Sequence, residues 1–433
     1  MVRVAILGYG GRGRIYAMIL RFLQKRRAKL VAVIDNNPDK LALAKRDTKT
    51  LDDGCLYSDY AEFLKKDKCA DWLFVCTQDS YHFGHTMAAL EKGYDVLLEK
   101  PVSADLAECA EIARKSQELG RKVAVCHVLR YSKFYDKVKE VIESGVLGKL
   151  VALEMHENVG YWHYAHSYTR GDWRNSETST PMIFAKCCHD LDLMVYMLGA
   201  KCLSVQSQGR LNYFKRENEP AVCADRCVNC KNDKCPYNAV KLYEDKLKKF
   251  PRFARQFAWP MTRVVEDGVP TVEKVHEALC KGDFGKCVFR CDNNVVDYQT
   301  VSLDFDDGVQ VTLTMTAFSP AIYRTITVRG SEGILEGKFE DKKLTLSLFG
   351  KKPRTIRAAR SFIGHGGGDI GLIAALVNGN IRTDIFQSIQ SHAIAYAAEQ
   401  SRVKGGEKVV LDEFAENALS ATSDGAEKSK HTS

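Results

Sequence analysis

A glycine-rich turn between two apolar segments limits what the start of this chain can fold into. The stretch VRVAILG has the composition of a short buried strand, and RGRIYAMILRFLQKR has the spacing of an amphipathic helix. Between them, GYGGRG places Gly8, Gly10 and Gly13 in the G-x-G-x-x-G spacing, and Asp35 ends the next aliphatic stretch. Such glycines permit a tight turn and the close approach of a pyrophosphate to a helix N-terminus. A strand, this loop, a helix and a later acidic residue together predict a dinucleotide site.

The acidic residue also bears on which dinucleotide binds. A carboxylate at Asp35 can accept hydrogen bonds from both adenosine ribose hydroxyls and would repel a 2′-phosphate. The sequence therefore favours NAD over NADP. The alternative, a glycine-rich turn that binds no ligand, remains open. We expect the following loop residues to contact the cofactor: Gly8, Tyr9, Gly10, Gly11 and Arg12.

Strand-like and helix-like stretches alternate through the first third of the chain. This alternation is typical of parallel strands joined by crossover helices. We predict an α/β fold whose first part, residues 1–125, is a doubly wound parallel sheet of the Rossmann type. The predicted strands are residues 2–8, 29–35, 71–77, 94–100 and 122–127.

After about residue 125 the pattern changes. A strand is predicted over 149–161 and a helix over 181–198, where apolar residues recur at helical spacing. Residues 296–318 alternate by two around an Asp-Gly turn, which indicates a hairpin, and 324–349 continues it. We expect a substrate-binding α/β domain, residues 126–419, on a mostly antiparallel open sheet.

Composition narrows the remaining possibilities. Residues 205–290 fit the sheet poorly and are interpreted as a cysteine-rich insertion, and the small, polar stretch 420–433 as a flexible tail. Fifteen cysteines and no predicted signal peptide indicate reduced thiols in the cytoplasm. No apolar run is long enough to span a membrane. The basic and aromatic stretch 246–257 is interpreted as a solvated face, so we expect neither a nucleic-acid nor a membrane partner.

Two further stretches carry reactive side chains. In LLEKPVS, Glu99 and Lys100 stand at the C-terminal end of a predicted parallel strand, where ligands bind in such sheets. In AKCCHDLD, His189 stands between a cysteine pair and two aspartates. An ammonium can stabilise a developing alkoxide, and an imidazole can accept its proton. The alternatives without a catalytic role are a surface ion pair at residues 99–100 and a buried structural histidine at position 189.

These stretches together resemble the glucose–fructose oxidoreductase / inositol dehydrogenase (Gfo/Idh/MocA) family. The resemblance rests on the glycine loop, VCTQDSYH (75–82), EKP (99–101), CHVLRY (126–131) and the HDLD helix. It covers essentially residues 1–200 and is looser beyond, where GHGGGD (364–369) is again similar. Membership implies an NAD-dependent enzyme acting on a sugar or polyol, assembled as a homodimer or homotetramer.

The resemblance also implies roles for single residues. In the family the lysine of EKP binds substrate and nicotinamide ribose, and the helix histidine is the general base. Carried over, these are Lys100 and His189, our candidate catalytic pair. Further residues match loops that line the dinucleotide: Thr77, His82, Glu99, His127 and Arg130.

One position departs from the family pattern. Many polyol dehydrogenases of the family have an aspartate four residues before the histidine, where this chain has Ala185 followed by Lys186. Lys186 is either a second cation in the pocket or simply part of the polar face of the helix. The chain also has side chains suited to sugar hydroxyls or a carboxylate, which could instead pack the domain junction. Our candidate substrate contacts are Tyr161, Arg170, Trp173, Arg174, Lys186 and His365.

Four cysteines lie close together in CADRCVNCKNDKC. Thiolates at Cys223, Cys227, Cys230 and Cys235 suit a structural zinc ion. Free thiols in an irregular loop and an iron–sulfur cluster are the alternatives. The stretch GKCVFRCDNN could supply further ligands if the insertion folds back.

The sequence therefore favours an NAD-dependent oxidoreductase acting on a secondary alcohol of a sugar or polyol. An alternative uses the same first step. Some relatives are glycoside hydrolases in which NAD transiently oxidises C3, the glycosidic bond eliminates, water adds and the ketone is reduced again. A third alternative is an NAD-sensing binding protein without catalytic activity.

Overall fold

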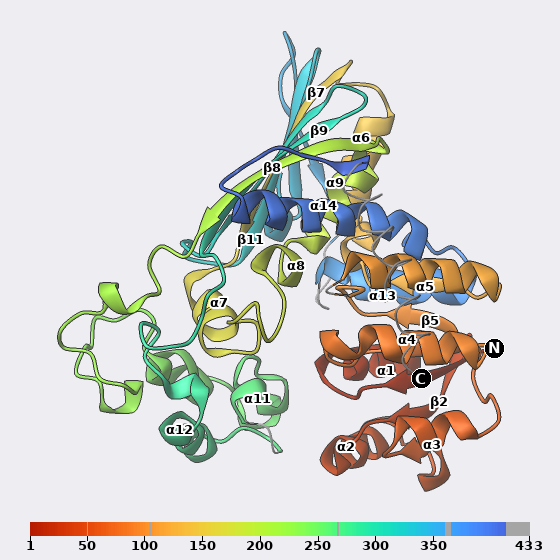
Figure 1. Ribbon diagram of the computed structural model, residues 1–433, viewed down its shortest axis with the longest axis vertical. Helices are drawn as coiled ribbons and strands as arrows, with labels where there is room; N and C mark the ends of the chain where they lie inside the picture. The colour runs from red at the N-terminus through yellow and green to blue at the C-terminus, as the bar shows by residue number, and fades with distance from the viewer. Residues whose placement is uncertain (50, 104, 266–267, 360–364, 413–433) are drawn as a thin grey trace, which may run out of the picture.

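The computed structural model carries side chains and shows two sheets with helices packed between and around them (Figure 1). It describes the chain except residues 50, 104, 266–267, 360–364 and 413–433. The predicted flexible tail, 420–433, lies outside the described residues. In the part of the chain that is described, no helix is long and apolar enough to cross a membrane.

The first sheet contains six strands, all paired in parallel, in the order β3-β2-β1-β4-β5-β6. The order reverses direction at β1, so the ends of β1 and β4 form the switch point where ligands bind in such sheets. The strands are β1 (Val2–Leu7), β2 (Ala28–Ile34), β3 (Leu56–Tyr57), β4 (Trp72–Val75), β5 (Asp95–Leu98) and β6 (Val123–Val125).

Helices cover both faces of this sheet, because alternate strand residues point to opposite sides. Ala5 and Leu7 pack with residues of α3, α4 and α5, whereas Val4 and Ile6 pack with α1, α2 and α13. The predicted doubly wound fold is confirmed. Its helices are α1 (Gly11–Leu23), α2 (Pro38–Thr48), α3 (Tyr60–Lys65), α4 (His82–Glu91), α5 (Leu106–Glu118) and, from near the end of the chain, α13 (Gly368–Asn378).

The second sheet contains nine strands in the order β14-β13-β12-β11-β7-β10-β9-β8-β15. Only β7 and β10 pair in parallel, so the mostly antiparallel sheet is confirmed. Its strands are β7 (Leu150–Asn158), β8 (Cys202–Arg210), β9 (Tyr298–Phe305), β10 (Gln310–Thr316), β11 (Tyr323–Gly330), β12 (Gly333–Lys338), β13 (Lys343–Leu348), β14 (Arg354–Arg357) and β15 (Val409–Val410).

One face of the second sheet is buried under helices. Along β9, β10 and β11 every second residue is buried, and the residues between are exposed or half-buried. The buried face packs against α9 and α14, which run beneath the sheet toward the first domain (Figure 1). The helices of this region are α6 (Lys133–Glu143), α7 (Tyr161–Tyr164), α8 (Met182–Ala185), α9 (Cys188–Leu198) and α14 (Ile385–Val403).

The predicted single helix over 181–198 is two helices. It is interrupted by a turn at Lys186 and Cys187, and α9 begins at Cys188. Lys186 and His189 therefore do not share one continuous helix face, as the helical spacing had suggested. The break carries the end of α8 toward the strand ends of the first sheet, where Ala185 meets Lys100.

The insertion begins later than predicted, because residues 205–210 belong to β8. It runs over residues 211–297 and consists of turns and short helices among the described residues. Aromatic side chains form its core, including Phe214, Tyr237 and Tyr243. It extends from the ends of β8 and β9 and lies beside α7 (Figure 1). Its α-helices are α10 (Lys246–Lys248), α11 (Met261–Val264) and α12 (Val272–Lys281).

Candidate active site

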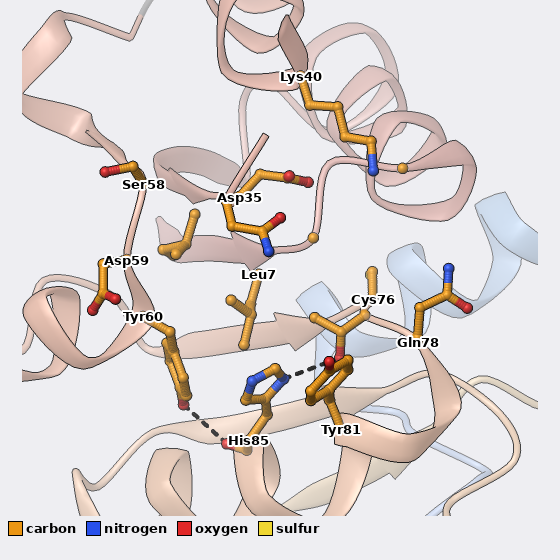
Figure 2. A pocket seen from close by; sticks show the side chains of 15 residues that line it. Leu7, Asp35, Lys40, Ser58, Asp59, Tyr60, Cys76, Gln78, Tyr81 and His85 are labelled. Atoms are coloured by element: carbon orange, nitrogen blue, oxygen red, sulfur yellow. Dashed lines mark hydrogen bonds between the residues drawn. The ribbon is translucent and has the colours of Figure 1, made fainter. Parts of the chain in front are cut away.

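A cavity of about 370 Å³ lies at the C-terminal ends of β1, β2 and β4 (Figure 2). Its position is the topological switch point of the first sheet. Backbone and side chains from four loops line it: Leu7, Gly8, Gly10, Ile34, Asp35, Asn36, Lys40, Ser58, Asp59, Tyr60, Cys76, Thr77, Gln78, Tyr81 and His85. Of the predicted cofactor residues, Gly8, Gly10, Asp35 and Thr77 are among them.

The glycines of the loop have different structural roles. Gly8 has φ of +91°, and a Cβ there would lie 2.6 Å from the carbonyl oxygen of Cys76. A Cβ on Gly13 would lie 2.1 Å from the carbonyl oxygen of Gly8. By contrast, a Cβ on Gly10 or Gly11 would meet no atom within 4 Å. The first and last glycines are thus needed to close the turn, and the middle ones leave the N-terminus of α1 open to a pyrophosphate.

Asp35 lies on the wall of this cavity, at the end of β2. Its carboxylate accepts hydrogen bonds from the backbone N–H groups of Tyr9, at 2.7 Å, and Asn37, at 2.9 Å. These two bonds hold the carboxylate at the cavity and join the glycine loop to the next turn. Lys40, which is exposed, is a cation at the same cavity (Figure 2). The residues present therefore fit the adenosine half of a dinucleotide.

The opposite wall contains residues that the sequence reasoning missed. Nδ1 of His85 and Oγ1 of Thr77 form a hydrogen bond of 3.1 Å. The His85 ring stacks on Tyr81, with 5.5 Å between the ring centroids. Tyr60 donates its hydroxyl to the carbonyl oxygen of His85 at 2.9 Å (Figure 2). The spacing of His85 four residues after Tyr81 on α4 was the available signal, because residues four apart share a helix face.

Arg12 points away from the cavity into a polar cluster. Its guanidinium contacts Glu99 at 2.6 Å, Asp369 at 2.6 Å and the hydroxyl of Tyr16 at 2.5 Å. Although burial alone would raise the pKa of Asp369, hydrogen bonds from His365 and Arg12 hold it below its usual range. We predicted Arg12 and Glu99 as cofactor contacts, but the structure pairs their side chains with each other. This pairing fastens α1 to α13.

His82 joins two of the loops at the site. Its ring nitrogens lie 2.7 Å from the carbonyl oxygen of Pro101 and 3.2 Å from that of Thr77. The ring is fully buried. His82 therefore spans the ends of β4 and β5 and positions the Lys100–Pro101 turn, whose peptide bond is cis.

Lys100 and His189 come together from the two domains. The ammonium of Lys100 donates to the carbonyl oxygen of Ala185 at 2.9 Å, at the end of α8. His189, in the first turn of α9, is 6 % exposed, and its Nδ1 has no hydrogen-bond partner among the described residues. Burial lowers the pKa of His189 well below its usual value of 6.5, and the positive charge of Lys100 is the second-largest cause. A neutral imidazole thus stands beside an ammonium.

Two more histidines surround His189. The ring centroids of His127 and His365 lie 6.0 and 5.7 Å from its own. His127 is fully buried, and burial lowers its pKa as well. His365 is half-exposed and its Nδ1 lies 3.0 Å from Asp369. The segment GHGGGD, of which residues 365–369 are described, thus brings His365 next to the helix histidine.

Arg130 has a place different from the predicted one. It is 2 % exposed and forms a two-bond ion pair with Asp192, at 2.6 and 2.7 Å. It also donates to the carbonyl oxygen of Arg382 at 2.7 Å. The carboxylate of Asp192, three residues after His189, is therefore occupied by Arg130. This pair fastens α9 to the end of β6 and to α14.

Lys186 belongs to a buried group of four charges. Its ammonium lies 3.3 Å from Glu157, and Arg324 lies 2.7 Å from both Glu157 and Asp190. Two cations therefore face two carboxylates. Burial raises the pKa of Asp190 to about 6, while Arg324 opposes that rise. Of the two roles considered for Lys186, a pocket cation or part of the polar face of the helix, neither is tested here; its charge is largely balanced within the protein.

The four remaining candidate substrate contacts divide into two pairs. Trp173 donates to Asp79 of the first domain at 3.4 Å, and Tyr161 lies 6.1 Å from Tyr237 between ring centroids. Both are half-buried; Trp173 thus contacts the first domain, and Tyr161 contacts the insertion. Arg170 is 1 % exposed inside the insertion, and Arg174 is ion-paired with Asp292 at 2.7 Å. The two arginines thus hold the insertion, which is the junction-packing alternative.

The switch-point cavity, the glycine turn and the acidic residue at the end of β2 define a dinucleotide-binding α/β protein. Two family models match the chain: the oxidoreductase family's NAD-binding Rossmann fold over residues 2–127, and its C-terminal alpha/beta domain over residues 139–356. The chain belongs to this Gfo/Idh/MocA oxidoreductase family. It is an NAD-dependent oxidoreductase, as the sequence predicted.

Similar proteins agree with that assignment. A putative oxidoreductase, YteT of Bacillus subtilis, is 22% identical over 410 residues, which are 89% of this chain and 91% of that protein. An oxidoreductase from Agrobacterium radiobacter, solved with NAD+, L-tartaric acid and magnesium, has a TM-score of 0.67 at 14% identity, covering 95% and 99% of the two chains. An inositol dehydrogenase homologue from Azotobacter vinelandii, solved with NADH and myo-inositol, has a TM-score of 0.66 at 16% identity, covering 94% and 97%.

Proposed function

We propose that this enzyme transfers a hydride between NAD and a secondary alcohol of a sugar or polyol. The observation that carries the proposal is that Lys100, just after β5, donates to the carbonyl oxygen of Ala185, close enough to the buried His189 on α9 that its charge lowers the pKa of that imidazole. When bound, the nicotinamide accepts or returns the hydride. The relative from Azotobacter vinelandii, solved with NADH and myo-inositol, supports a polyol as the substrate class.

His189 would accept the hydroxyl proton. Because its pKa is lowered by burial and by Lys100, the imidazole is neutral at physiological pH and can act as a base. Among the described residues its Nδ1 has no hydrogen-bond partner, which supports a role for this ring in accepting a proton from a ligand. His365, 5.7 Å away between centroids and half-exposed, offers a path by which that proton reaches solvent.

Lys100 would stabilise the oxygen as its proton leaves. Its ammonium is fixed by the Ala185 carbonyl and keeps two further donors for a ligand. A positive charge at the alcohol oxygen favours the alkoxide-like transition state more than the neutral alcohol. It also keeps the proton off His189 before the reaction. The two residues therefore support each other's proposed roles.

The surroundings support an uncharged polyol more than an anion. Lys186 faces Glu157, and Arg324 faces both Glu157 and Asp190, so the two cations are balanced by two carboxylates. Tyr161 and Trp173 are half-buried aromatic side chains of the same domain and have flat faces on which a sugar ring can stack. We include these two in the proposed substrate site, rather than Arg170 and Arg174, whose guanidinium groups contact the insertion.

The test measures reduced nicotinamide and aglycone release together. The protein is incubated with stoichiometric NAD and, separately, with free polyols and aryl glycosides. Net NADH formation from free polyols supports the proposal. Multiple turnovers of aglycone release without net NADH would contradict it and favour the hydrolase alternative. Tight NAD binding with silence in both assays would indicate a binding protein instead.

We also propose a cytoplasmic homo-oligomer. All fifteen cysteines are free, which supports a reducing compartment. The face of β9, β10 and β11 away from the helices carries half-buried and exposed residues such as Thr312 and Thr314. An open sheet face of this size supports pairing with a second copy. Light scattering after gel filtration should give the mass of a dimer or tetramer, and a monomer would contradict this.

A further inference from the structure

The insertion brings cysteines from separate segments together with a carboxylate. The ligand atoms of Glu219, Cys223 and Cys287 all lie within 4.8 Å of one another. Around a tetrahedral zinc with Zn–S bonds of about 2.3 Å, ligand atoms stand roughly 3.8 Å apart. These three side chains are therefore close to a coordinating arrangement without any change of backbone.

Cys230 can supply a fourth ligand, although its sulfur is not among the ligand atoms that lie within 4.8 Å of one another. The thiols of Cys230 and Cys287 are both close enough to Cys223 to act on its pKa, which burial raises. Cys230 follows a short 3-10 helix, Cys227–Asn229, that turns the chain back toward Cys223. It comes from the same loop as Cys223, whereas Cys287 comes from beyond α12. The cluster thus joins two distant parts of the insertion.

The other two cysteines of the sequence motif face a different partner. The thiol of Cys227 accepts from Arg170 at 3.4 Å and lies 3.8 Å from the carbonyl oxygen of Lys286. Neither Cys227 nor Cys235 belongs to the group of ligand atoms that lie within 4.8 Å of one another. Because the thiol of Cys227 already accepts from Arg170 inside the core of the insertion, it is left out of the proposed ligand set. The spacing alone had pointed to Cys227 and Cys235; the geometry does not.

We propose that the insertion contains a structural zinc site formed by Cys223, Cys230, Cys287 and Glu219. Each of the three thiols loses a proton as its sulfur bonds to the metal, and the carboxylate binds through one oxygen. Four anionic ligands on a divalent cation leave a net charge of −2. Arg290, 2.5 Å from Glu219, and Arg216, 3.2 Å from it, stand where they offset that charge.

The fold of the insertion supports the need for such a site. Its longest helix, α12, has ten residues, and the described part contains no strand. Small, loop-rich units commonly depend on a metal or disulfides for stability. Backbone contacts already align the two halves: the N–H of Cys287 donates to the carbonyl oxygen of Asp225 at 2.8 Å, and Arg226 pairs with Lys286 in an isolated bridge. Zinc would fix this alignment.

The site would also bear on catalysis indirectly. Tyr237, seven residues after Cys230, contacts Tyr161. Trp259 of the insertion lies 5.4 Å from Trp162 of α7 between ring centroids. Zinc would therefore stabilise one wall of the proposed substrate site without touching substrate.

The test is metal analysis of the full chain, purified without chelator under reducing conditions. We expect about one zinc per chain. Cys223→Ser and Cys287→Ser should lose most of it, whereas Cys280→Ser, an exposed cysteine on α12, should retain it. Zinc that survives Cys287→Ser but is lost in Cys235→Ser would overturn the ligand set.

A second measurement covers variants that fail to fold. The wild-type protein is stripped with a chelator and titrated with Co²⁺, whose absorption spectrum reports thiolate ligation and tetrahedral geometry. Thiolate-to-cobalt absorption that saturates at one equivalent supports the site. The melting temperature should fall when the metal is stripped and rise again when Co²⁺ is added. Absence of zinc in the purified protein together with absence of cobalt–thiolate absorption would overturn the proposal.

Discussion

Replacing Gly13 or Gly10 of the glycine loop by alanine should have different consequences. Gly13→Ala should lower the stability of the fold, whereas Gly10→Ala should weaken NAD binding. In Gly13→Ala the new Cβ would lie 2.1 Å from the carbonyl oxygen of Gly8, whereas ordinary contact begins at 3.4 Å. The obstacle is backbone, so the turn between β1 and α1 must open. Overpacking of this kind costs roughly 1 to 3 kcal/mol, and the better helix propensity of alanine returns about 1 kcal/mol. Because the new Cβ meets backbone at 2.1 Å, the cost should lie at the upper end of that range, and we expect a net loss of about 2 kcal/mol in the free energy of unfolding.

Gly10→Ala should leave folding almost unchanged. Its φ and ψ of −76° and −160° are accessible to alanine, and its Cβ would meet no protein atom within 4 Å. The space it enters is where a pyrophosphate approaches the helix N-terminus. We expect the free energy of unfolding to change by less than about 1 kcal/mol and the affinity for NAD to fall at least about tenfold, which is 1.4 kcal/mol.

Urea unfolding with and without NAD separates these effects. At a hundred times Kd, ligand stabilises the folded wild type by about 2.7 kcal/mol, and Gly10→Ala should lose about half of that increment or more at the same NAD concentration. Gly13→Ala should be less stable already without NAD. Wild-type NAD affinity in Gly10→Ala, or wild-type stability in Gly13→Ala, would refute the reasoning.

Three further substitutions test other parts of the site. Asp192→Asn leaves the buried guanidinium of Arg130 without its counter-charge and should lower the free energy of unfolding by roughly 3 to 5 kcal/mol in urea melts. Asp35→Ser removes the carboxylate that repels a 2′-phosphate, so the ratio of NADP to NAD affinity, measured by calorimetry, should rise. Lys100→Met removes a charge that lowers the pKa of His189; the acid limb of kcat/KM, which lies below pH 6.5 in the wild type, should move to higher pH.

Each of these has a control or a contrary outcome. For the buried pair, the control is Asp71→Asn, which breaks the exposed ion pair with Arg3 and should cost about 1 kcal/mol or less; equal losses would contradict the assignment. Unchanged cofactor preference in Asp35→Ser would show that the carboxylate does not discriminate. The sign for His189 follows from its protonation: only the neutral ring is a base, so an acid limb that stays in place without Lys100 would show that another group titrates.

The fold of the first domain could be predicted from local sequence because its strands and helices form where the hydrophobic patterns predict them. The aliphatic stretches around Gly8 and Asp35 alternate with amphipathic helices, and each strand pairs with neighbours that the pattern implies. What could not be read was α13, which returns from residue 368 to cover the first sheet. Its apolar residues reveal that it is buried but not against what, because that depends on contacts distant in the chain.

The sequence indicated which residue types belong to the candidate site, but it did not indicate which side chains contact one another. The family resemblance brought Lys100 and His189 to attention, and the structure places the lysine at the helix that precedes the histidine. Arg12 and Arg130, in contrast, had the same appearance in sequence as ligand-binding arginines. Their acidic partners, Asp369 and Asp192, are far along the chain, so sequence gave no sign that both guanidinium groups are already satisfied.

The measurement that tests the central claim most directly is transfer of deuterium to NAD. A panel of polyols deuterated at their secondary carbons is incubated with the enzyme and NAD+, and the reduced cofactor is examined by mass spectrometry. We predict one deuterium on the nicotinamide ring from at least one polyol, with transfer strongly slowed in Lys100→Met and His189→Ala, while both variants still bind NAD. Deuterium transfer at wild-type rate in both variants, or none from any polyol to the NAD-bound wild type, would contradict the proposed hydride transfer by this pair.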